Sequence, residues 1–323
     1  CVNRPASIVV NNAGEIFISE ENNHIVRKVN TIGIITTFAG TPRNDNYGGD
    51  GGLARNALLN HPRGLAINGE GELFIADATN NRIRKVDKSR IISTVVDELS
   101  SPIAVSVGRD GELFIVESGK HQVTMVDNNG LRSIVAGTSV AGPSIGDFYL
   151  PENATLALVS SVSVLSDTEL IVTDTYNHMI KKVNITDKSI VALTDPNGLH
   201  LPLSYPRGSI IVNNEIYFAD YGNHCIRKID LDGLVSDVAG ICGNGGYSVD
   251  GMQANSTQLF YPSSVVVASN GDMFIADSGN HVIRRVRNGI ITTIAGTVGQ
   301  AKFLGNGVPA LNSLLYEPTD MAI

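Results

Sequence analysis

One pattern of residues occurs six times along the chain, and no other feature restricts the possible folds as strongly. Each copy begins with a large hydrophobic residue, reaches an acidic residue shortly afterwards, and ends in an aliphatic residue after a polar or basic stretch. The copies begin at Phe17, Phe74, Phe114, Ile171, Tyr217 and Phe274. A repeat of about 40 residues with insertions between the copies is typical of the blades of a β-propeller.

Each repeat contains enough short hydrophobic segments for four β-strands. In the last copy these segments are residues 262–267, 272–277, 281–286 and 290–295. The dipeptide Asn270-Gly271 separates the first segment from the second, and Asn288-Gly289 separates the third from the fourth. Because Asn and Gly tolerate positive φ angles, both dipeptides predict type I′ hairpin turns.

The repeats predict an all-β fold, a six-bladed β-propeller of four-stranded antiparallel blades. A sheet of this kind has two apolar faces, and a ring of sheets covers both while leaving few edges. We expect one domain over residues 1–323, with blades at about residues 5–41, 62–97, 102–138, 159–194, 206–241 and 262–297. Residues 316–323 resemble an extra innermost strand, which either closes the ring or begins a further repeat.

Charge and hydropathy exclude two classes of partner. The formal net charge is −8, and no basic run interrupts it, which argues against nucleic acid. No apolar stretch approaches the roughly 18 residues of a membrane-spanning helix, so we expect no membrane insertion by this segment. Because the chain starts at Cys1 without a methionine or a leader, we expect a mature chain or a fragment of a larger protein.

The repeat carries a recognisable dipeptide. Four copies have an Asn-His pair before the third strand, at Asn23-His24, Asn177-His178, Asn223-His224 and Asn280-His281. Together with the similar glycine-rich loops at residues 48–62, 245–262 and 305–318, the pattern resembles the NHL repeat. The loops resemble those of NHL propellers in large extracellular proteins, teneurin-like ones included. The family includes protein-binding scaffolds, RNA-binding domains, sensor domains and a peptide-amidating lyase, so the resemblance implies a fold rather than a function.

Polar residues that recur once per blade are better explained by structure than by chemistry. The repeat spreads its histidines over different blades, so we expect them to form structural hydrogen bonds and to bind no metal. We expect the acidic residues to accept hydrogen bonds from loop backbone or from a nearby Asn, and the arginines to pair locally or to stay solvated. These residues are His24, His121, His178, His224 and His281; Glu20, Asp77, Glu117, Asp174, Asp220 and Asp277; and Arg27, Arg84, Arg227 and Arg284.

The remaining motifs give little support for catalysis. The oxygen-rich loop from Asn44 to Asp50 could attract calcium, but it lacks the spacing of an EF-hand, and turn formation explains its glycines. The chain contains no recognisable Ser-His-Asp order, nucleophile elbow, nucleotide-binding loop or Cys-His pair. We therefore expect no catalytic residues and no cofactor.

The loops that precede the innermost strands are the best candidates for binding, because they converge at one end of the central channel. Exposed tyrosines near these loops are good interface anchors, although loop packing explains them equally well. The candidate binding residues are Arg63, Arg207, Ser161, Ser263, Thr319, Tyr47, Tyr149, Tyr247 and Tyr261.

Cysteines and glycosylation triplets indicate the compartment. A hairpin near Asp232-Gly233 would bring Cys225 close to Cys242, which predicts a disulfide; the alternative is two free thiols. Asn153, Asn184 and Asn255 each begin an Asn-x-Ser/Thr triplet in a predicted loop or turn. These features favour an extracellular or lumenal setting.

The sequence therefore favours a non-enzymatic scaffold that presents a loop-rich propeller face to a protein or glycan partner, and that is monomeric as a domain. The alternative is a hydrolase or lyase with its active site in the central channel, as in some six-bladed propeller enzymes.

Overall fold

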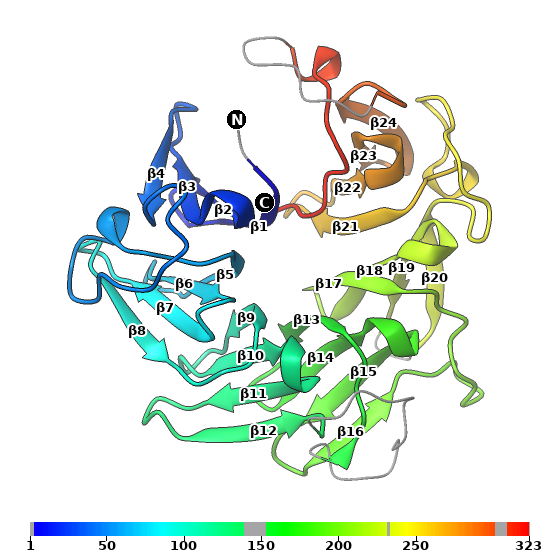
Figure 1. Cartoon of the computed structure of the whole chain (residues 1–323). Coiled ribbons are helices and arrows are strands. Elements are labelled where there is room, and N and C mark those ends of the chain that lie inside the picture. Colours follow the sequence, from blue (N-terminus) through cyan, green and yellow to red (C-terminus); the bar gives the residue numbers. More distant parts are fainter. Residues whose placement is uncertain (1–2, 139–152, 231–232, 301–308, 323) are drawn as a thin grey trace. The chain divides into compact units, whose positions relative to one another are not determined.

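The computed structural model describes residues 3–138, 153–230, 233–300 and 309–322. They form six four-stranded antiparallel sheets, and no α-helix occurs among them. The predicted fold class, a six-bladed β-propeller, is confirmed. In each sheet every strand pairs with its neighbour in the chain, as Figure 1 shows for β5, β6, β7 and β8.

The strands of the first three sheets are β1 (Pro5–Val10), β2 (Ile16–Glu20), β3 (Ile25–Val29) and β4 (Ile35–Ala39); β5 (Pro62–Ile67), β6 (Leu73–Asp77), β7 (Arg82–Val86) and β8 (Ile92–Val96); and β9 (Pro102–Val107), β10 (Leu113–Glu117), β11 (Gln122–Val126) and β12 (Arg132–Ala136). Those of the last three are β13 (Val159–Val164), β14 (Glu169–Asp174), β15 (Met179–Asn184) and β16 (Ser189–Ala192); β17 (Pro206–Val212), β18 (Glu215–Asp220), β19 (Cys225–Ile229) and β20 (Val235–Ala239); and β21 (Pro262–Val267), β22 (Met273–Asp277), β23 (Val282–Arg287) and β24 (Ile290–Ala295).

Single turns of 3-10 helix connect some of these strands. Most of them follow the second strand of a sheet, and the others lie in the long loops between sheets. They are η1 (Glu21–Asn23), η2 (Ala54–Asn56), η3 (Ser118–Lys120), η5 (Thr175–Asn177), η6 (Tyr221–Asn223), η7 (Ala254–Ser256), η8 (Ser278–Asn280) and η9 (Ala310–Asn312). None of the helices in the described part of the chain is long and apolar enough to span a membrane.

The chain divides into two compact units. Unit 1 contains residues 1–170 and 183–191 with residue 322, and unit 2 contains residues 171–182 and 192–321 with residue 323. In unit 1 the first strands of successive sheets lie side by side, β1 next to β5, β5 next to β9, and β9 next to β13. In unit 2, β17 lies next to β21 in the same way.

The two predicted hairpin turns of the last sheet differ in type. Asn288 and Gly289 both have positive φ angles, of 52° and 78°, as a type I′ turn requires, so this prediction is confirmed. The prediction for Asn270-Gly271 is wrong, because only Gly271 has a positive φ, of 83°. The Gly271 N–H donates to the Ala268 carbonyl, and the Ala268 N–H donates to the Asp272 carbonyl. This is a longer turn that ends in a left-handed glycine.

The hydrophobic core lies between the faces of neighbouring sheets. In unit 1, Phe17 and Val26 of the first sheet share a cluster with Leu73 and Ile75 of the second. Leu59, on the loop that joins these sheets, is fully buried in that cluster. Burying one such side chain contributes about 1.5–3 kcal/mol to stability, so Leu59 holds its loop against the two sheets.

Residues 316–322 form no β-strand, contrary to the extra innermost strand that the sequence suggested. The Pro318 carbonyl accepts hydrogen bonds from the hydroxyls of Ser263 and Ser278, and the Thr319 carbonyl accepts one from Ser263. These carbonyls therefore accept hydrogen bonds from side-chain hydroxyls, whereas in a strand they would accept them from the backbone N–H groups of a neighbouring strand.

Candidate functional site

The site is built from the end of each sheet at which the first strand begins, the second ends and the third begins. We call this end the rim, and describe it separately for each unit. Three repeat positions form it: the residue before the first strand, the residue after the first position of that strand, and the residue after the acid that ends the second strand. The first strand begins at a proline in every sheet except the fourth: Pro5, Pro62, Pro102, Pro206 and Pro262.

The repeat acids fix the rim segment of their own sheet. Asp77 is fully buried, and its carboxylate accepts hydrogen bonds from the Asn60 N–H (2.6 Å) and the Asn80 amide (2.9 Å). Asp277 accepts the corresponding bonds from Phe260 and Asn280, at 2.7 and 2.8 Å. The predicted role of the acids is confirmed in these sheets.

Burial determines the protonation of these carboxyls more than any other factor. It raises the pKa of Asp77 and of Asp220 above the usual range, and it raises the pKa of Asp277 to about 6. The hydrogen bonds from backbone and Asn donors oppose this shift, because they stabilise the carboxylate.

The repeat histidines fix the rim segment of the following sheet. The Nδ1 atom of His24 accepts the His61 N–H at 3.2 Å, and that of His224 accepts the Tyr261 N–H at 3.1 Å. His178 and His281 do the same for the N–H groups of Tyr205 and Glu317, at 3.0 and 3.2 Å. The predicted structural role is confirmed for these four histidines. It is not confirmed for His121, whose buried Nδ1 has no hydrogen-bond partner among the described residues. Burial lowers the pKa of His24 and of His224, which favours the neutral ring that can accept.

The residue type at this position follows from the backbone. His24 has a φ of 57°, and the other repeat histidines have φ between 48° and 61°. His and Asn are enriched in this left-handed region. The second sheet has Asn81 there, with a φ of 57°, and its Oδ1 accepts the Ser101 N–H at 2.9 Å. Asn therefore replaces His without loss of the hydrogen bond, since Oδ1 and Nδ1 occupy the same place in the side chain.

Two consecutive N–H groups of a rim segment are thus held by two different sheets. In the segment before β21, the Phe260 N–H bonds to Asp277 of its own sheet and the Tyr261 N–H bonds to His224 of the preceding sheet. The second residue of each pair is left-handed, as in His61 (φ 50°) and Tyr261 (φ 48°). The repeat residues hold the backbone, and the variable side chains of the rim project from fixed positions.

In unit 1 the rim is hollowed by a cavity of about 320 Å³. Arg63 donates from Nε and Nη2 to Oε1 of Glu21, at 3.0 and 2.7 Å, and Arg4 contacts the other carboxylate oxygen at 3.0 Å. Gly64 follows Arg63 because β5 and β9 come too close for a side chain: a Cβ there would lie 2.6 Å from the Ala104 Cα. The cavity is lined by Arg4, Glu21, His61, Arg63, Ala78, Thr79, Ser101, Ile103 and Ser118.

In unit 2 the rim carries aromatic side chains instead. Tyr176 and Tyr205 pack edge to face with ring centroids 5.5 Å apart, and Tyr221 lies 4.9 Å from Tyr261. The Arg207 guanidinium lies over the Tyr221 ring, 3.7 Å from its centroid. Tyr176, Tyr205 and Tyr261 remain 57%, 39% and 37% exposed. We call these five residues the tyrosine surface.

The predicted binding residues separate into several groups. Arg207 and Tyr261 lie on the tyrosine surface, and Arg63 lines the cavity of unit 1. Ser263 is buried, and its hydroxyl bonds to Ser278 and to the Pro318 and Thr319 carbonyls. Tyr149 lies outside the described residues.

The fourth sheet has a different register from the one the sequence suggested. Leu158 is the left-handed residue before the strand, with a φ of 45°, and β13 begins at Val159. The residue equivalent to Arg63 is therefore Ser160, and Ser161 is the next one along. The first strand of this sheet begins without the proline that marks Arg63 and Arg207, and this removed the signal that would have set the register.

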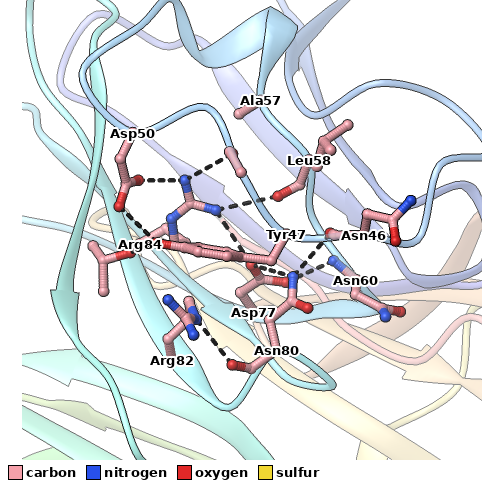
Figure 2. Close-up of polar contacts among 12 residues, drawn as sticks. Asn46, Tyr47, Asp50, Ala57, Leu58, Asn60, Asp77, Asn80, Arg82 and Arg84 are labelled. Atoms are coloured by element: carbon pink, nitrogen blue, oxygen red, sulfur yellow. Dashed lines mark hydrogen bonds and ion pairs between the residues drawn. The ribbon is translucent and has the colours of Figure 1, made fainter.

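The rings of Tyr47 and Tyr247 pack against buried arginines, and both rings remain partly exposed. In Figure 2 the Arg84 guanidinium is surrounded by oxygen atoms: it donates to Asp50 (2.5 Å), Asp77 (3.4 Å) and the carbonyls of Gly48 (3.3 Å) and Leu58 (3.2 Å). The Tyr47 ring lies 5.1 Å from this guanidinium. Arg284 repeats the arrangement with Asp250, Asp277 and Tyr247.

This geometry decides two questions that the sequence left open. Arg84 and Arg284 pair locally, as predicted, but they are fully buried rather than solvated. The Asp50 carboxylate of the oxygen-rich loop binds Arg84, so a guanidinium takes the place considered for calcium. Among the described residues, no group of three or more His, Cys, Asp or Glu side chains is arranged to hold a metal ion.

The disulfide between Cys225 and Cys242 is present, which confirms the prediction; the two Cα atoms are 5.1 Å apart. It joins the start of β19 to the loop after β20. Of the glycosylation candidates, Asn153 and Asn255 are exposed. Asn184 is partly buried, and its Oδ1 accepts the Thr186 and Asp187 N–H groups.

Sequence reasoning missed three members of the tyrosine surface, Tyr176, Tyr205 and Tyr221. A signal was available for Tyr205, because it precedes Pro206 as Tyr261 precedes Pro262. Tyr221 directly follows the repeat acid Asp220, a position that the structure places on the rim.

Comparisons with known proteins agree with this architecture. Residues 39–101 match the family model of the Teneurin NHL domain. Teneurin-4 of Mus musculus is 26% identical over 301 residues, which cover 85% of this chain and 10% of teneurin-4. The chain therefore spans about a tenth of the length of this curated relative.

Two further relatives support the repeat and the fold. NHL repeat-containing protein 2 of Bos taurus is 34% identical over 129 residues, which cover 35% of this chain and 18% of that protein. The crystal structure of virginiamycin B lyase from Staphylococcus aureus is similar with a TM-score of 0.64 at 18% identity, covering 92% of this chain and 86% of that one. A sequence identity this low is evidence of a similar fold but not of a similar function. The six repeats and the six sheets make the chain a six-bladed β-propeller that is similar to the NHL domains of teneurins.

Proposed function

We propose that the chain is a non-enzymatic interaction scaffold that binds a partner protein through its rim. The observation that carries the proposal is the tyrosine surface of unit 2. There Arg207 stacks on Tyr221 beside the exposed Tyr261, and the exposed pair Tyr176 and Tyr205 lies on the same rim. Tyr and Arg are the side chains that most often dominate the binding energy of protein interfaces.

The rim is also well suited to binding because its backbone is already ordered. The segments that carry Tyr205 and Tyr261 are each held by an acid of one sheet and a histidine of another. Binding to a preordered surface loses less conformational entropy than binding to a mobile loop.

The repeat acids and histidines support a scaffold over a hydrolase or lyase. The carboxylates of Asp77 and Asp277 accept hydrogen bonds from backbone and Asn donors. The Nδ1 atoms of His24 and His224 each accept a hydrogen bond from a backbone N–H group. A general acid or base needs a position within hydrogen-bond reach of a substrate, whereas these groups are directed at the chain itself.

We propose an extracellular or lumenal setting for the domain. The disulfide supports it, because disulfides persist in oxidising compartments, and the exposed sequon residues Asn153 and Asn255 are open to glycosylation. Secretion of the chain from animal cells, followed by enzymatic removal of N-glycans, is expected to lower its mass. Replacing Asn255 by Gln should remove part of that shift, and an unchanged mass after deglycosylation would contradict the proposal.

The test of the function is capture of partners by the purified chain. We expect proteins from a detergent extract of cell surfaces to be retained by the wild type and lost with Tyr261→Ala or Arg207→Ala. Loss of an interface anchor costs about 2 kcal/mol or more, which is about thirtyfold in affinity. A glycan array probed with the same proteins distinguishes a sugar partner.

Leu199→Ala is the matched control, because Leu199 is an apolar residue of unit 2 that is 65% exposed and lies outside the tyrosine surface. It should retain every partner. Retention of the same proteins by Tyr261→Ala and Arg207→Ala, at equal strength and with an intact fold by circular dichroism, would refute the assignment of the surface.

A further inference from the structure

A second concave surface in unit 1 lies away from the rim positions. It is a groove of about 580 Å³ between β4 of the first sheet, the η2 loop, and the turn that joins β7 to β8. This volume is within the range of ligand-binding sites. The groove is lined by Glu15, Lys28, Asn30, Ile34, Thr36, Thr37, Phe38, Leu53, Ala54, Arg55 and Arg90.

Two arginines of the groove have no carboxylate partner among the described residues. Arg55 and Arg90 are exposed, and neither forms an ion pair or a side-chain hydrogen bond within that part of the chain. Glu15 is the carboxylate of the lining, and Lys28 binds it at 2.6 Å. The Lys28 hydrogen bond, with smaller contributions from Asn11 and the charge of Arg90, holds the pKa of Glu15 below its usual value.

The backbone at both arginines is fixed. The Ala54 N–H donates to the Arg90 carbonyl at 2.8 Å, and the Arg90 N–H donates to the Asp87 carbonyl at 2.9 Å. Ala54, next to Arg55, is fully buried. The two guanidinium groups therefore extend from ordered positions on one groove.

Unit 2 has a groove of about 570 Å³ that shares three positions with it: Lys228, Val238 and Gly289 replace Lys28, Phe38 and Arg90. The rest of its lining comes mostly from the β17–β18 and β21–β22 hairpins, so the comparison concerns the backbone around these positions. There Lys228 binds Glu215 at 2.5 Å as Lys28 binds Glu15, and the Ala254 N–H donates to Gly289 as that of Ala54 donates to Arg90. At the two arginine positions unit 2 has Asn255 and Gly289. The same scaffold forms without the arginines, so the fold does not require them.

We infer that the groove of unit 1 binds an acidic peptide segment, whose carboxylates pair with Arg55 and Arg90 and whose apolar side chain packs against Phe38 and Leu53. Arginine matches carboxylate oxygens in a planar, two-pronged geometry. Leu53 is 42% exposed and Ile34 is 54% exposed, which gives an apolar chain a surface to cover. Free phosphate or a sulfated sugar would use the arginines but leave this apolar wall uncovered.

The test measures fluorescence anisotropy of labelled peptides in which Asp and Glu flank a central leucine or phenylalanine. We expect the wild-type chain to bind these peptides, more weakly as salt rises, and to bind the Asn and Gln versions at least about fivefold more weakly, as loss of two exposed ion pairs implies. Arg55→Asn combined with Arg90→Gly converts the groove to the residues of unit 2 and should weaken binding to the same extent.

Arg43→Gly is the matched control. Arg43 is exposed, has a left-handed φ of 59° like that of Arg90 (64°), and does not line the groove. It should bind like the wild type, whereas Arg90→Gly alone, which removes the same single charge, should weaken binding; this comparison excludes net charge as the cause. The inference is overturned if no acidic peptide binds, if the double variant binds as tightly as the wild type, or if heparin-derived oligosaccharides bind and acidic peptides do not.

Discussion

The buried Arg84 is the position where a single substitution should most affect stability. Its guanidinium and the Asp77 carboxylate are both fully buried. The Nη1 and Nη2 atoms of Arg84 also donate to Asp50 and two loop carbonyls, whereas its Nε has no hydrogen-bond partner among the described residues. The variant Arg84→Met keeps most of the side-chain volume and removes the charge. It leaves the Asp77 carboxylate without a cation, and the Gly48 and Leu58 carbonyls without these donors.

The magnitude follows from the burial. Removing one partner of a buried ion pair costs about 3–5 kcal/mol. Asp77 keeps hydrogen bonds from Asn60 and Asn80, which places the expected loss near about 3 kcal/mol. Such a loss is a large part of the stability of an ordinary domain. Because Arg84 lowers the pKa of Asp77 against the effect of burial, the variant should hold a proton on Asp77 more tightly. Its deficit should therefore shrink at acidic pH and be largest at about pH 8.

Urea denaturation followed by circular dichroism measures the effect, since the chain contains no tryptophan. Arg82→Met is the control: its guanidinium lies over the Tyr47 ring at 3.6 Å without a carboxylate partner among the described residues, so about 1 kcal/mol or less is expected. Adding Asp77→Asn to Arg84→Met should cost less than the sum of the two single changes. A loss below about 1 kcal/mol for Arg84→Met, or strict additivity, would refute the reasoning.

Three further predictions concern the rim and the disulfide. His224→Ala should destabilise the chain by about 1–2 kcal/mol and speed hydrogen exchange of the Tyr261 amide, whereas His224→Asn should behave nearly like the wild type, because Asn81 shows that Asn makes the same bond. Since burial lowers the pKa of His224, the unfolded chain takes up its proton first; the stability is complete above about pH 6.5 and falls as the pH drops through the lowered pKa, a slope that His224→Asn should reduce. Replacing Cys225 and Cys242 by Ser removes a loop closure across a separation of 17 residues and should cost about 3 kcal/mol, measured by thermal unfolding.

The fold could be predicted because its signals are local and repeated. Six copies of one strand pattern indicate six sheets, and the antiparallel pairing of β19 with β20 brings Cys225 to Cys242. The role of the repeat acids and histidines followed from the same symmetry, since residues present once per blade serve what every blade has in common.

The candidate site was predictable only in part. Tyr261 and Arg207 were found because each lies next to the start of a predicted innermost strand, and a proline begins that strand in both sheets. The fourth sheet has no such proline, and the register of Ser161 was off by one residue. For Tyr47 the sequence leaves an interface anchor and loop packing equally open, because it does not show that an arginine from β7 lies against the ring.

The sequence by itself determined the fold class, the number of blades and the disulfide, because these depend on periodicity and on turns within a few residues of each other. Only the tertiary structure decided which variable side chains meet: Tyr221 with Tyr261, Asp50 with Arg84, and Arg55 with Arg90 come from different loops or sheets. These contacts form when blades and loops pack together. The residues involved differ from one repeat to the next, so the repeat pattern gives no information about which of them meet.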